Sequence, residues 1–463
     1  MYSNVFGLSR ARALPSGASP ALTLTAMSLG FAVVQLDVTV VNVALKTIGS
    51  SFGGGIAGLQ WVVNAYTVVF ASLILTSGAL GDRLGAKRLF IAGFIVFVGA
   101  SIACAAAPSL IILIGARAVQ GIGAAVLVPC SLALLDHTYQ DPGPRAKAVG
   151  IWAGIAGVAL AGGPVIGGVL IASVGWRAIF FINLPLGLLG IWLTARYASE
   201  STQSRERPLD LTGQAAAVIA VAALAAAIIE GGAIGWSSAL VIAGFAVFVV
   251  AGALFLAIEA RKASPMLPLS FFRNATFTAA SVVGLLINLA FYGLIFVLSL
   301  HFQQIMRFPP LTTGLAFMPM TIVVVAANVL AGQISAWLGA RPPMVVGQAF
   351  FAAGCLFLVT LGANTPYGSL WWYTVMMGAG IGLTVPPMTS ALLATVDRKQ
   401  SGVASGVLNT TRQLGSVIGV ALFGSLIANR GQFIPGLHLA LYISATVLLI
   451  GMAVAFIGIR DDC

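Results

Sequence analysis

The sequence predicts an all-α polytopic membrane protein, because the chain is strongly apolar, poor in charge and rich in glycine. Of its 463 residues, 59% are hydrophobic and only 8% are charged, whereas a soluble domain carries roughly 25% charged residues. The mean hydropathy is +1.03. The 54 glycines suit membrane helices, in which small residues let backbones pack closely. These observations exclude a soluble globular protein.

Fourteen spans are predicted, since about 20 mostly apolar residues cross a bilayer. Their approximate ranges are 21–45, 57–80, 89–108, 110–135, 148–174, 178–198, 211–230, 238–258, 277–300, 312–335, 343–363, 370–395, 402–428 and 437–459. The stretch before the first span carries Arg10 and Arg12 and is expected to be a cytoplasmic tail ahead of an uncleaved span. An even number of spans places both termini on one side.

The basic residues support this topology. With a cytoplasmic N-terminus, the inner loops and tails hold 17 Lys and Arg residues against 4 in the outer loops, Lys46 among them. This is the bias of the positive-inside rule. The net charge of +11 is therefore interpreted as a topology signal, because no long basic block for nucleic acid is present. We expect a multi-pass protein of the cytoplasmic membrane with both termini cytoplasmic.

Two short segments recur in the second half of the chain. GIGAAVLV from Gly121 is echoed by GIGLTVPP from Gly380 at an offset of 259, and LGAK from Leu84 by LGAR from Leu338 at an offset of 254. This offset exceeds six spans by about one hairpin. The sequence therefore predicts a six-helix bundle (1–198), an inserted two-span hairpin with its linkers (199–262) and a second six-helix bundle (263–463). Such paired halves are typical of secondary transporters, with a site near the midplane between them.

The two copies differ in their polar residues. The first copy has four polar positions that become apolar or small in the second: Arg117 and Gln120 are matched by Met376 and Ala379, and Asp82 and Arg83 by Ala336 and Trp337. Whatever chemistry these residues serve is concentrated in the first half.

Three ionisable residues fall well inside predicted spans: Asp37, Arg117 and Arg412. Glu230 and Glu259 fall near span ends. Buried charges cost several kcal/mol unless paired or hydrated, so a functional role is the expectation. Counted from the nearest expected membrane edge at about 1.5 Å per residue, Asp37 and Arg117 both lie roughly 12 to 14 Å deep. The two can lie at the same level, although the sequence does not prove contact.

The first span has two polar faces. On a helical wheel Gln35, Thr39, Asn42 and Lys46 form one stripe, and Asp37 points nearly opposite. Desolvation favours the protonated form of a carboxylate, and a nearby arginine opposes it. A conformational change that alters either influence would load and release a proton, which is the requirement for proton coupling.

Several ordered motifs resemble the major facilitator superfamily, and specifically its fourteen-span drug:proton antiporters. The resemblance covers nearly the whole chain, and the motifs that carry it are LDVTVVNVAL from Leu36, WVVNAYTVVFAS from Trp61, GALGDRLGAKR from Gly78, RAVQGIGAA from Arg117, GIWAGIAGVALAGGPVIGG from Gly150 and WRAIFFINLPLG from Trp176. Two positions depart from the family pattern: this chain has Ala159 where the pattern has Gly, and Lys46 where the first span usually ends with Pro.

The resemblance implies a major facilitator fold with two six-helix bundles and two inserted spans. It implies that Asp37 carries the proton and that Arg117 governs its protonation. The loop motif then acts as a conformational latch through Gly81, Asp82, Arg83, Gly85 and Arg88. The antiporter motif, which seals the pathway and distinguishes exporters from importers, comprises Gly150, Gly163, Pro164, Gly167 and Gly168.

The expected function is proton-coupled efflux of a small amphipathic drug or antibiotic. The alternative is a proton-coupled transporter of an endogenous metabolite on the same fold. The expected substrate cavity includes Gln35, Asn42, Asn64, Gln120, Trp152 and Arg412, although a structural role for Arg412 is equally compatible with the sequence. Relatives that export dications carry further acids in the tenth or thirteenth span, and this chain does not, which favours a neutral, monocationic or anionic compound over a dication. Methylenomycin-type antibiotic exporters of this family begin with a very similar first span, which makes such antibiotics candidate substrates.

Other functions are disfavoured. No HExxH, GxSxG or paired-carboxylate motif suggests an enzyme, and no ring of charges or filter loop suggests a channel. The four cysteines form no CxxC pair and no disulfide framework. We expect no metal and no cofactor, with the proton gradient as energy source. The expected partners are a small-molecule substrate, protons and the lipid bilayer, without nucleic acid, and the protein is expected to be a monomer.

Overall fold

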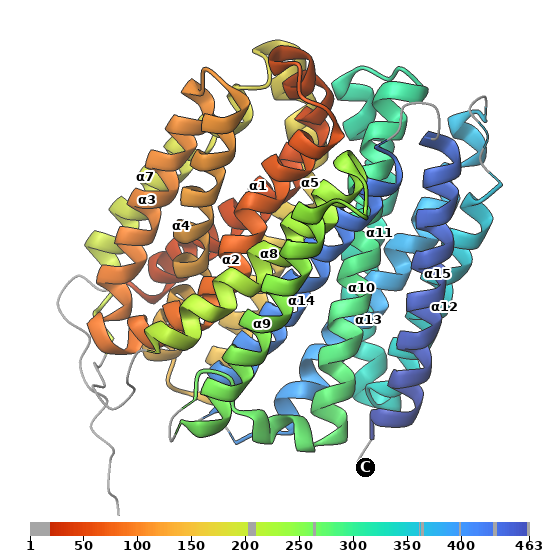
Figure 1. Ribbon diagram of the computed structural model, residues 1–463. Helices are drawn as coiled ribbons and strands as arrows, with labels where there is room; N and C mark the ends of the chain where they lie inside the picture. The colour runs from red at the N-terminus through yellow and green to blue at the C-terminus, as the bar shows by residue number, and fades with distance from the viewer. Residues whose placement is uncertain are drawn as a thin grey trace, which may run out of the picture.

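The computed structural model describes residues 19–201, 210–262, 265–360, 362, 365–397, 400–428 and 433–460. Within these ranges the chain is helical throughout, with no strand (Figure 1). The first half forms α1 (Pro20–Phe52), α2 (Ile56–Leu84), α3 (Ala86–Ala106), α4 (Leu110–Thr138), α5 (Pro142–Ser173), α6 (Ala178–Phe181) and α7 (Asn183–Tyr197). A hairpin of α8 (Leu211–Ile234) and α9 (Ala239–Arg261) follows.

The second half begins with a 3-10 turn, η1 (Leu269–Arg273), and contains a π-helical turn, η2, directly after α10. Its elements are α10 (Ala275–Leu300), η2 (His301–Ile305), α11 (Pro310–Leu338), α12 (Arg341–Leu358), η3 (Tyr367–Ser369), α13 (Trp371–Ala394), α14 (Ser401–Leu426) and α15 (Phe433–Gly458).

The predicted spans all coincide with helices. Thirteen helical segments of the described chain are long and apolar enough to cross a membrane, α6 and α7 counting as one. The remaining predicted span, 402–428, corresponds to α14, a helix of 26 residues that carries a polar run at 409–413. The predicted span 178–198 is confirmed by the helical segment Ala178–Tyr197, which is interrupted at Ile182 between α6 and α7.

Local signals explain the ends of α1. The Ser19 side chain accepts a hydrogen bond from the Leu22 amide and Pro20 occupies the first turn, which are favoured arrangements at a helix start. The helix ends at Gly53, whose φ of 69° is left-handed. Lys46 was expected in an outer loop but lies within α1, because the helix continues beyond the predicted span as far as Phe52.

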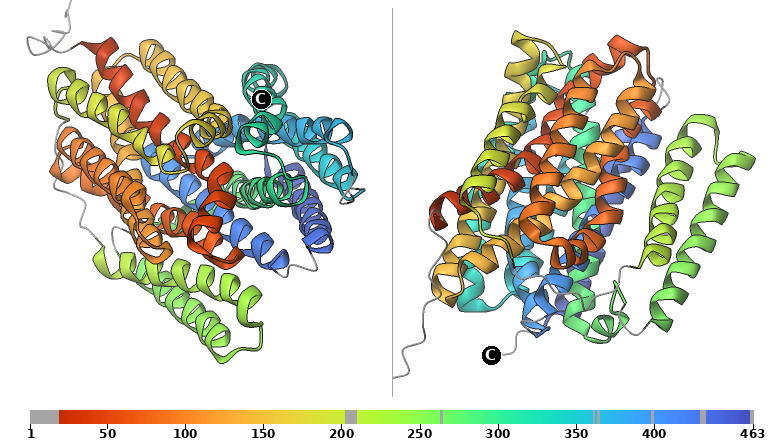
Figure 2. Two further views of the ribbon diagram at one scale, coloured as in Figure 1. Left: turned by 90° about the horizontal axis from the view of Figure 1, so that it is seen from above. Right: turned by 90° about the vertical axis from the view of Figure 1, so that its left-hand side faces the viewer.

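The helix packing of the first half is repeated in the second. The α1–α5, α2–α4 and α3–α4 contacts correspond to α10–α14, α11–α13 and α12–α13. Between the halves, α5 packs on α11 and α2 on α14. Figure 2 shows the two groups of helices side by side. The domain boundaries at 198 and 262 stay a prediction, because residues 202–209 and 263–264 lie outside the described chain.

The α8–α9 hairpin lies at the edge of the molecule, where it packs on α2 and α14 (Figure 2). Two hydrogen bonds join it to α2: Trp61 Nε1 donates to Glu230 at 3.1 Å, and Gln214 Nε2 donates to the Ser72 carbonyl at 2.8 Å. The Leu267 amide, in the segment before α10, donates to Glu259 of α9 at 2.9 Å. The hairpin therefore has polar contacts with both halves.

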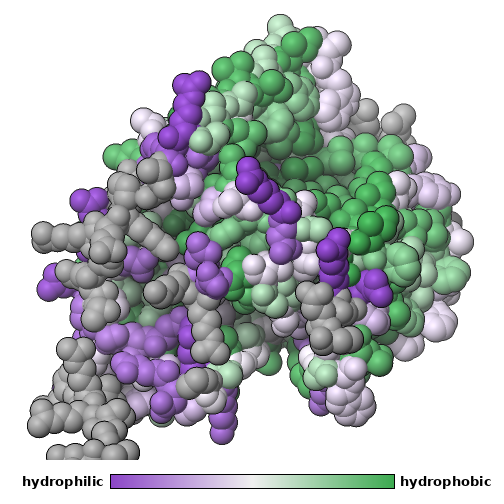
Figure 3. Space-filling model, turned by 90° about the horizontal axis from the view of Figure 1, so that it is seen from below, coloured by the Kyte–Doolittle hydropathy of each residue, from purple (hydrophilic) through white to green (hydrophobic). Residues whose placement is uncertain are grey.

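The two ends of the helix array differ. We call the end at which α15 finishes, the lower one in Figure 1, the terminal face, and the other end the opposite face. At the opposite face the halves are joined: Ser299 Oγ of α10 donates to the Asn42 carbonyl of α1 at 2.7 Å, and Lys46 Nζ donates to the Gln303 carbonyl at 2.6 Å. Hydrophilic side chains gather on the terminal face (Figure 3).

Candidate functional site

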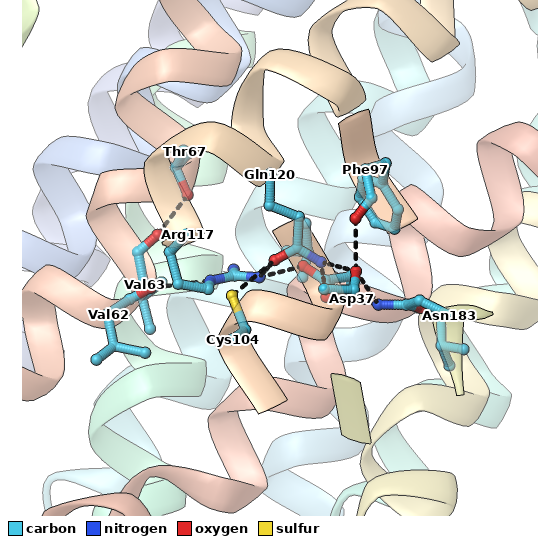
Figure 4. A network of polar contacts seen from close by, with 12 residues as sticks. Asp37, Val62, Val63, Thr67, Phe97, Cys104, Arg117, Gln120 and Asn183 are labelled. Carbon is cyan, nitrogen blue, oxygen red and sulfur yellow. Dashed lines mark hydrogen bonds and ion pairs between the residues drawn. The ribbon is translucent and has the colours of Figure 1, made fainter. Parts of the chain in front are cut away.

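The carboxylate of Asp37 lies in a closed polar cluster inside the first half (Figure 4). The side chain is 0% exposed. Its Oδ2 forms an ion pair with Arg117 of α4. Its Oδ1 accepts hydrogen bonds from Gln120 Nε2 at 2.9 Å and Asn183 Nδ2 at 3.2 Å. Both oxygens of the buried acid thus have donors, which is how a charge avoids the cost of burial.

The Arg117 guanidinium is equally well accommodated. Besides Asp37, it donates to Gln120 Oε1 at 2.6 Å and through Nε to the Val62 carbonyl of α2 at 3.1 Å. Its carbon Cζ lies 4.4 Å from the centre of the Tyr66 ring, a cation–π geometry. The expectation that Asp37 and Arg117 lie at the same level is matched by direct contact, and Arg117 links the acid to α2.

Sequence reasoning missed three members of this cluster. Ser101 of α3 accepts hydrogen bonds from Gln120 and Asn183, and Asn183 begins α7. Tyr66 covers the arginine from α2. Asn183 falls within the quoted FINLPLG motif, which was a usable signal. Single polar residues such as Ser101 inside an apolar run give no signal of their own.

The two polar faces of α1 meet different neighbours. Thr39 Oγ1 donates to the Leu160 carbonyl of α5 at 3.1 Å, and Lys46 reaches α10. Asp37 instead faces α4 and α7. The stripe that contains Thr39 and Lys46 therefore lies against α5 and the second half, while Asp37 is enclosed by the first half.

A cavity of about 570 Å³ opens between the halves at the terminal face. It is walled by the terminal-face ends of α2, α4, α5 and α14 and by the segment before α10. Trp152 lines it, stacks on Phe31 at 4.3 Å and donates to Ser131 Oγ at 3.1 Å. Asp82 and the pair Asp136–Arg145 also line it, and the two hydrogen bonds of this pair are both 2.7 Å.

Of the six predicted cavity residues, only Trp152 lines this cavity. Gln120 belongs to the Asp37 cluster, and Asn42 donates to the Val38 carbonyl of its own helix. Gln35 is half-buried on α1. Asn64 is fully buried on α2, and neither polar atom of its side chain has a partner within the described chain. Arg412 lies one turn beyond Asn409, which lines the cavity from α14.

The predicted latch joins α2 to α3. Gly85 separates the two helices with a φ of 97°, which favours glycine. The Lys87 amide donates to Glu200 Oε1 at 2.9 Å, and the Ala86 amide donates to Ser201 Oγ at 3.0 Å. Glu200 and Ser201 follow α7 and cap the start of α3, a role that the sequence did not suggest.

The remaining latch residues are spread around this turn. Gly81 is buried beside Cys130, Asp82 lines the cavity, and Arg83 is exposed. The Arg88 side chain is 80% exposed, and its Nε lies 3.9 Å from Glu200 Oε2. A pair this exposed contributes little to stability.

The glycines of the antiporter motif lie where helices approach most closely. A Cβ at Gly167 would be 2.7 Å from Val40 Cγ2 of α1, and one at Gly168 would be 2.7 Å from the Pro310 carbonyl of α11. Gly163 faces Thr39, and Pro164 faces Gly314 of α11. Only Gly150 stands apart, exposed and with no atom within 4 Å of a Cβ placed there. The other four residues hold α5 against α1 and the second half.

Comparisons with known proteins agree with this architecture. Residues 27–420 match the family description of the Major Facilitator Superfamily. The methylenomycin A resistance protein of Streptomyces coelicolor is 37% identical over 95% of this chain and 92% of its own length. The multidrug resistance protein Stp of Mycobacterium tuberculosis is 36% identical over 88% of this chain and 76% of its own.

A solved structure shares the fold. It is that of a bacterial homologue of the human lysosomal transporter Spinster, with a TM-score of 0.69 and 17% sequence identity over 96% of this chain and 97% of that one. The family match spans most of the sequence, and the relatives exceed 30% identity over nearly all of it. The chain therefore belongs to the Major Facilitator Superfamily and is a multi-pass membrane transporter.

Proposed function

We propose that this protein exports a small amphipathic drug or antibiotic in exchange for protons, with Asp37 as the proton carrier. The observation that carries the proposal is the Asp37–Arg117 pair, a fully buried charge pair in the membrane-spanning part of the chain. Ionisable residues inside membrane spans mark substrate and ion pathways or proton relays. The relatives named for methylenomycin A resistance and multidrug resistance support the assignment to drug export.

The geometry suggests how protonation would reach the substrate route. A proton on Asp37 removes the negative charge that holds Arg117. Arg117 also bonds the Val62 carbonyl and covers the Tyr66 ring, both on α2. That helix contacts α14 of the second half, since Gln60 Nε2 donates to the Val420 carbonyl at 3.0 Å. A change in the charge of Asp37 is thus transmitted to α2, which contacts the second half.

Alternating access accounts for the remaining features. The cavity opens at the terminal face, while α1–α10 and α5–α11 contacts join the halves at the opposite face. With both termini cytoplasmic in the bacterial cell membrane, this conformation would take up substrate from the cytoplasm. The latch residues and the antiporter motif would then govern, respectively, closing of the terminal face and opening of the opposite face.

The test is substrate-dependent proton flux in proteoliposomes with an imposed pH gradient. We would offer three fluorescent probes, the neutral Nile red, the cation ethidium and the anion 1-pyrenebutyrate. The wild type should exchange at least one of them for protons, and Asp37→Asn should reduce that flux to the level of empty liposomes. Asp141→Asn is the matched control, because Asp141 is exposed and its side chain caps no helix. Unchanged flux in Asp37→Asn would remove this residue from the mechanism.

A further inference from the structure

The second half contains a membrane-embedded charge that the protein leaves uncompensated. Arg412 lies near the middle of α14, eleven residues after its start and fourteen before its end. Among the residues that the structure describes, none forms an ion pair with its guanidinium or accepts a hydrogen bond from it, and the buried Nε has no partner. An unpaired charge in this position costs several kcal/mol.

The side chain is held in place even though its charged end is not. Its stem packs on α10, where a Cβ at Gly284 would lie 3.3 Å from Arg412 Cγ. Tyr292, two turns further along α10, lies near the guanidinium. Arg412 is partly exposed, and it lies one turn from Asn409, which lines the cavity. The fold therefore positions a cation close to the cavity.

The adjoining space is suited to an amphipathic molecule. Asn409, one turn before Arg412 on α14, lines the cavity at the terminal face, whose walls include Leu75, Met266 and Trp152. A ligand with one charged end can place its apolar body against these side chains while its head reaches the deeper arginine. The acids Asp82 and Asp136 also line the cavity, and Asp136 is paired with Arg145.

We infer that Arg412 binds the anionic group of the transported compound, so that the substrates are amphipathic monoanions carrying a carboxylate. The guanidinium presents parallel N–H donors that match the two oxygens of a carboxylate, which a neutral ester or an amine cannot replace. The ligand thus supplies the counter-ion that the protein lacks. This inference rests on the proposed export function and adds the charge of the substrate to it.

The first experiment uses the wild-type protein alone. Binding of 1-pyrenebutyrate, its methyl ester and the corresponding amine is measured by quenching of tryptophan fluorescence in detergent. The acid should bind at least about tenfold more tightly than the ester, as expected for hydrogen bonds to a charged group. Equal affinity for acid and ester, or preference for the amine, would overturn the inference without any mutation.

The second experiment compares variants of Arg412. Arg412→Gln should abolish the preference for the acid while leaving binding of the ester unchanged, and Arg412→Lys should retain part of it. Arg307→Gln removes an equal charge from an exposed position beyond α10 and should keep the full preference. An acid preference that survives in Arg412→Gln contradicts the assignment of this residue.

Transport separates this inference from the proposed function. If the wild type exchanges ethidium or Nile red for protons but ignores pyrenebutyrate, proton-coupled export stands and the anion inference fails. If pyrenebutyrate binds through Arg412 but no probe moves protons, the anion site stands and the proposed proton coupling fails. Proton exchange driven by pyrenebutyrate in the wild type and lost in Arg412→Gln supports both.

Discussion

Two arginines lie inside the membrane-spanning part of this protein, and their surroundings differ completely. Arg117 in the first half has a carboxylate, an amide oxygen, a backbone carbonyl and an aromatic ring as partners. Arg412 in the second half has no ion pair or hydrogen bond within the described chain. The repeat does not explain this, because the position equivalent to Arg117 is Met376. The first half carries its own counter-charge, and the second half carries a charge that has no counter-charge among the described residues.

Replacing each arginine by methionine should separate these roles most strongly. Arg117→Met leaves the buried Asp37 carboxylate without its counter-charge, which costs about 3–5 kcal/mol for a broken buried pair. Arg412→Met removes a charge that has no partner, so the free energy of unfolding should stay equal or rise. Thermal unfolding of the two variants in the same detergent measures the difference.

Removing both charges of the pair provides the control for Arg117→Met. The double variant Asp37→Asn with Arg117→Met should unfold at a higher temperature than Arg117→Met alone, because the carboxylate is then neutral. If the two arginine variants lose equal stability, or if neutralising Asp37 rescues nothing, the contrast between a paired and an unpaired arginine is wrong.

The contact between the halves can be tested at the antiporter motif. Gly168→Leu places a side chain against the Pro310 carbonyl, within 2.7 Å at its Cβ alone. Overpacking of this kind costs about 1–3 kcal/mol, and here it should open the joined opposite face. A cysteine introduced at Ser299, which bonds α1 across the interface, should then react faster with a membrane-impermeant maleimide.

The same motif supplies a matched control for Gly168→Leu. Gly150→Leu adds an identical side chain where nothing lies within 4 Å of the new Cβ. Its labelling rate at position 299 should equal that of the parent carrying only the cysteine. Equal rates in both variants would show that the α5–α11 approach does not hold the opposite face closed.

The sequence predicted the fold more completely than the site. Long apolar runs and the charge bias were enough to place the helices and to bring Asp37 and Arg117 to one level, because depth follows from helix geometry. Partners on other helices could not be predicted, since lateral packing depends on the whole bundle. For this reason Asn183 and Ser101 were missed, and Asn42 and Gln120 were assigned to a cavity that they do not line.

Two features that differ from the predictions, the polar run of α14 and the position of Lys46, are explained by the residues around them. The polar run around Arg412 lowers the apolarity of α14, yet the helix forms because its other residues pack against α10 and α2. Lys46 was expected in a loop but lies within α1 and reaches the Gln303 carbonyl in the π-helical turn of α10. That Arg412 lacks a partner is a property of the neighbouring helices, and no pattern in α14 itself could indicate it.

A third charge arrangement, at the base of the α8–α9 hairpin, should give the smallest effect. Burial raises the pKa of Asp210, but hydrogen bonds from Lys262, the Gly213 amide and the Thr212 hydroxyl outweigh it and hold the pKa below its ordinary value of 3.8. A lowered pKa in the folded state means that this stabilisation is complete above the ordinary pKa and is lost as the pH falls through the pKa of the folded state.

The Asp210–Lys262 pair lies beside water, unlike the buried pair at Asp37, since the Lys262 side chain is 36% exposed, and salt screens it. Unfolding temperatures at pH 5 and pH 3 should therefore differ less in Asp210→Asn than in the wild type, while Asp141→Asn keeps the wild-type difference. If the unfolding temperature falls equally in all three proteins between pH 5 and pH 3, Asp210 contributes no pH-dependent stability. Charge pairing would then stabilise this protein only where the membrane excludes water.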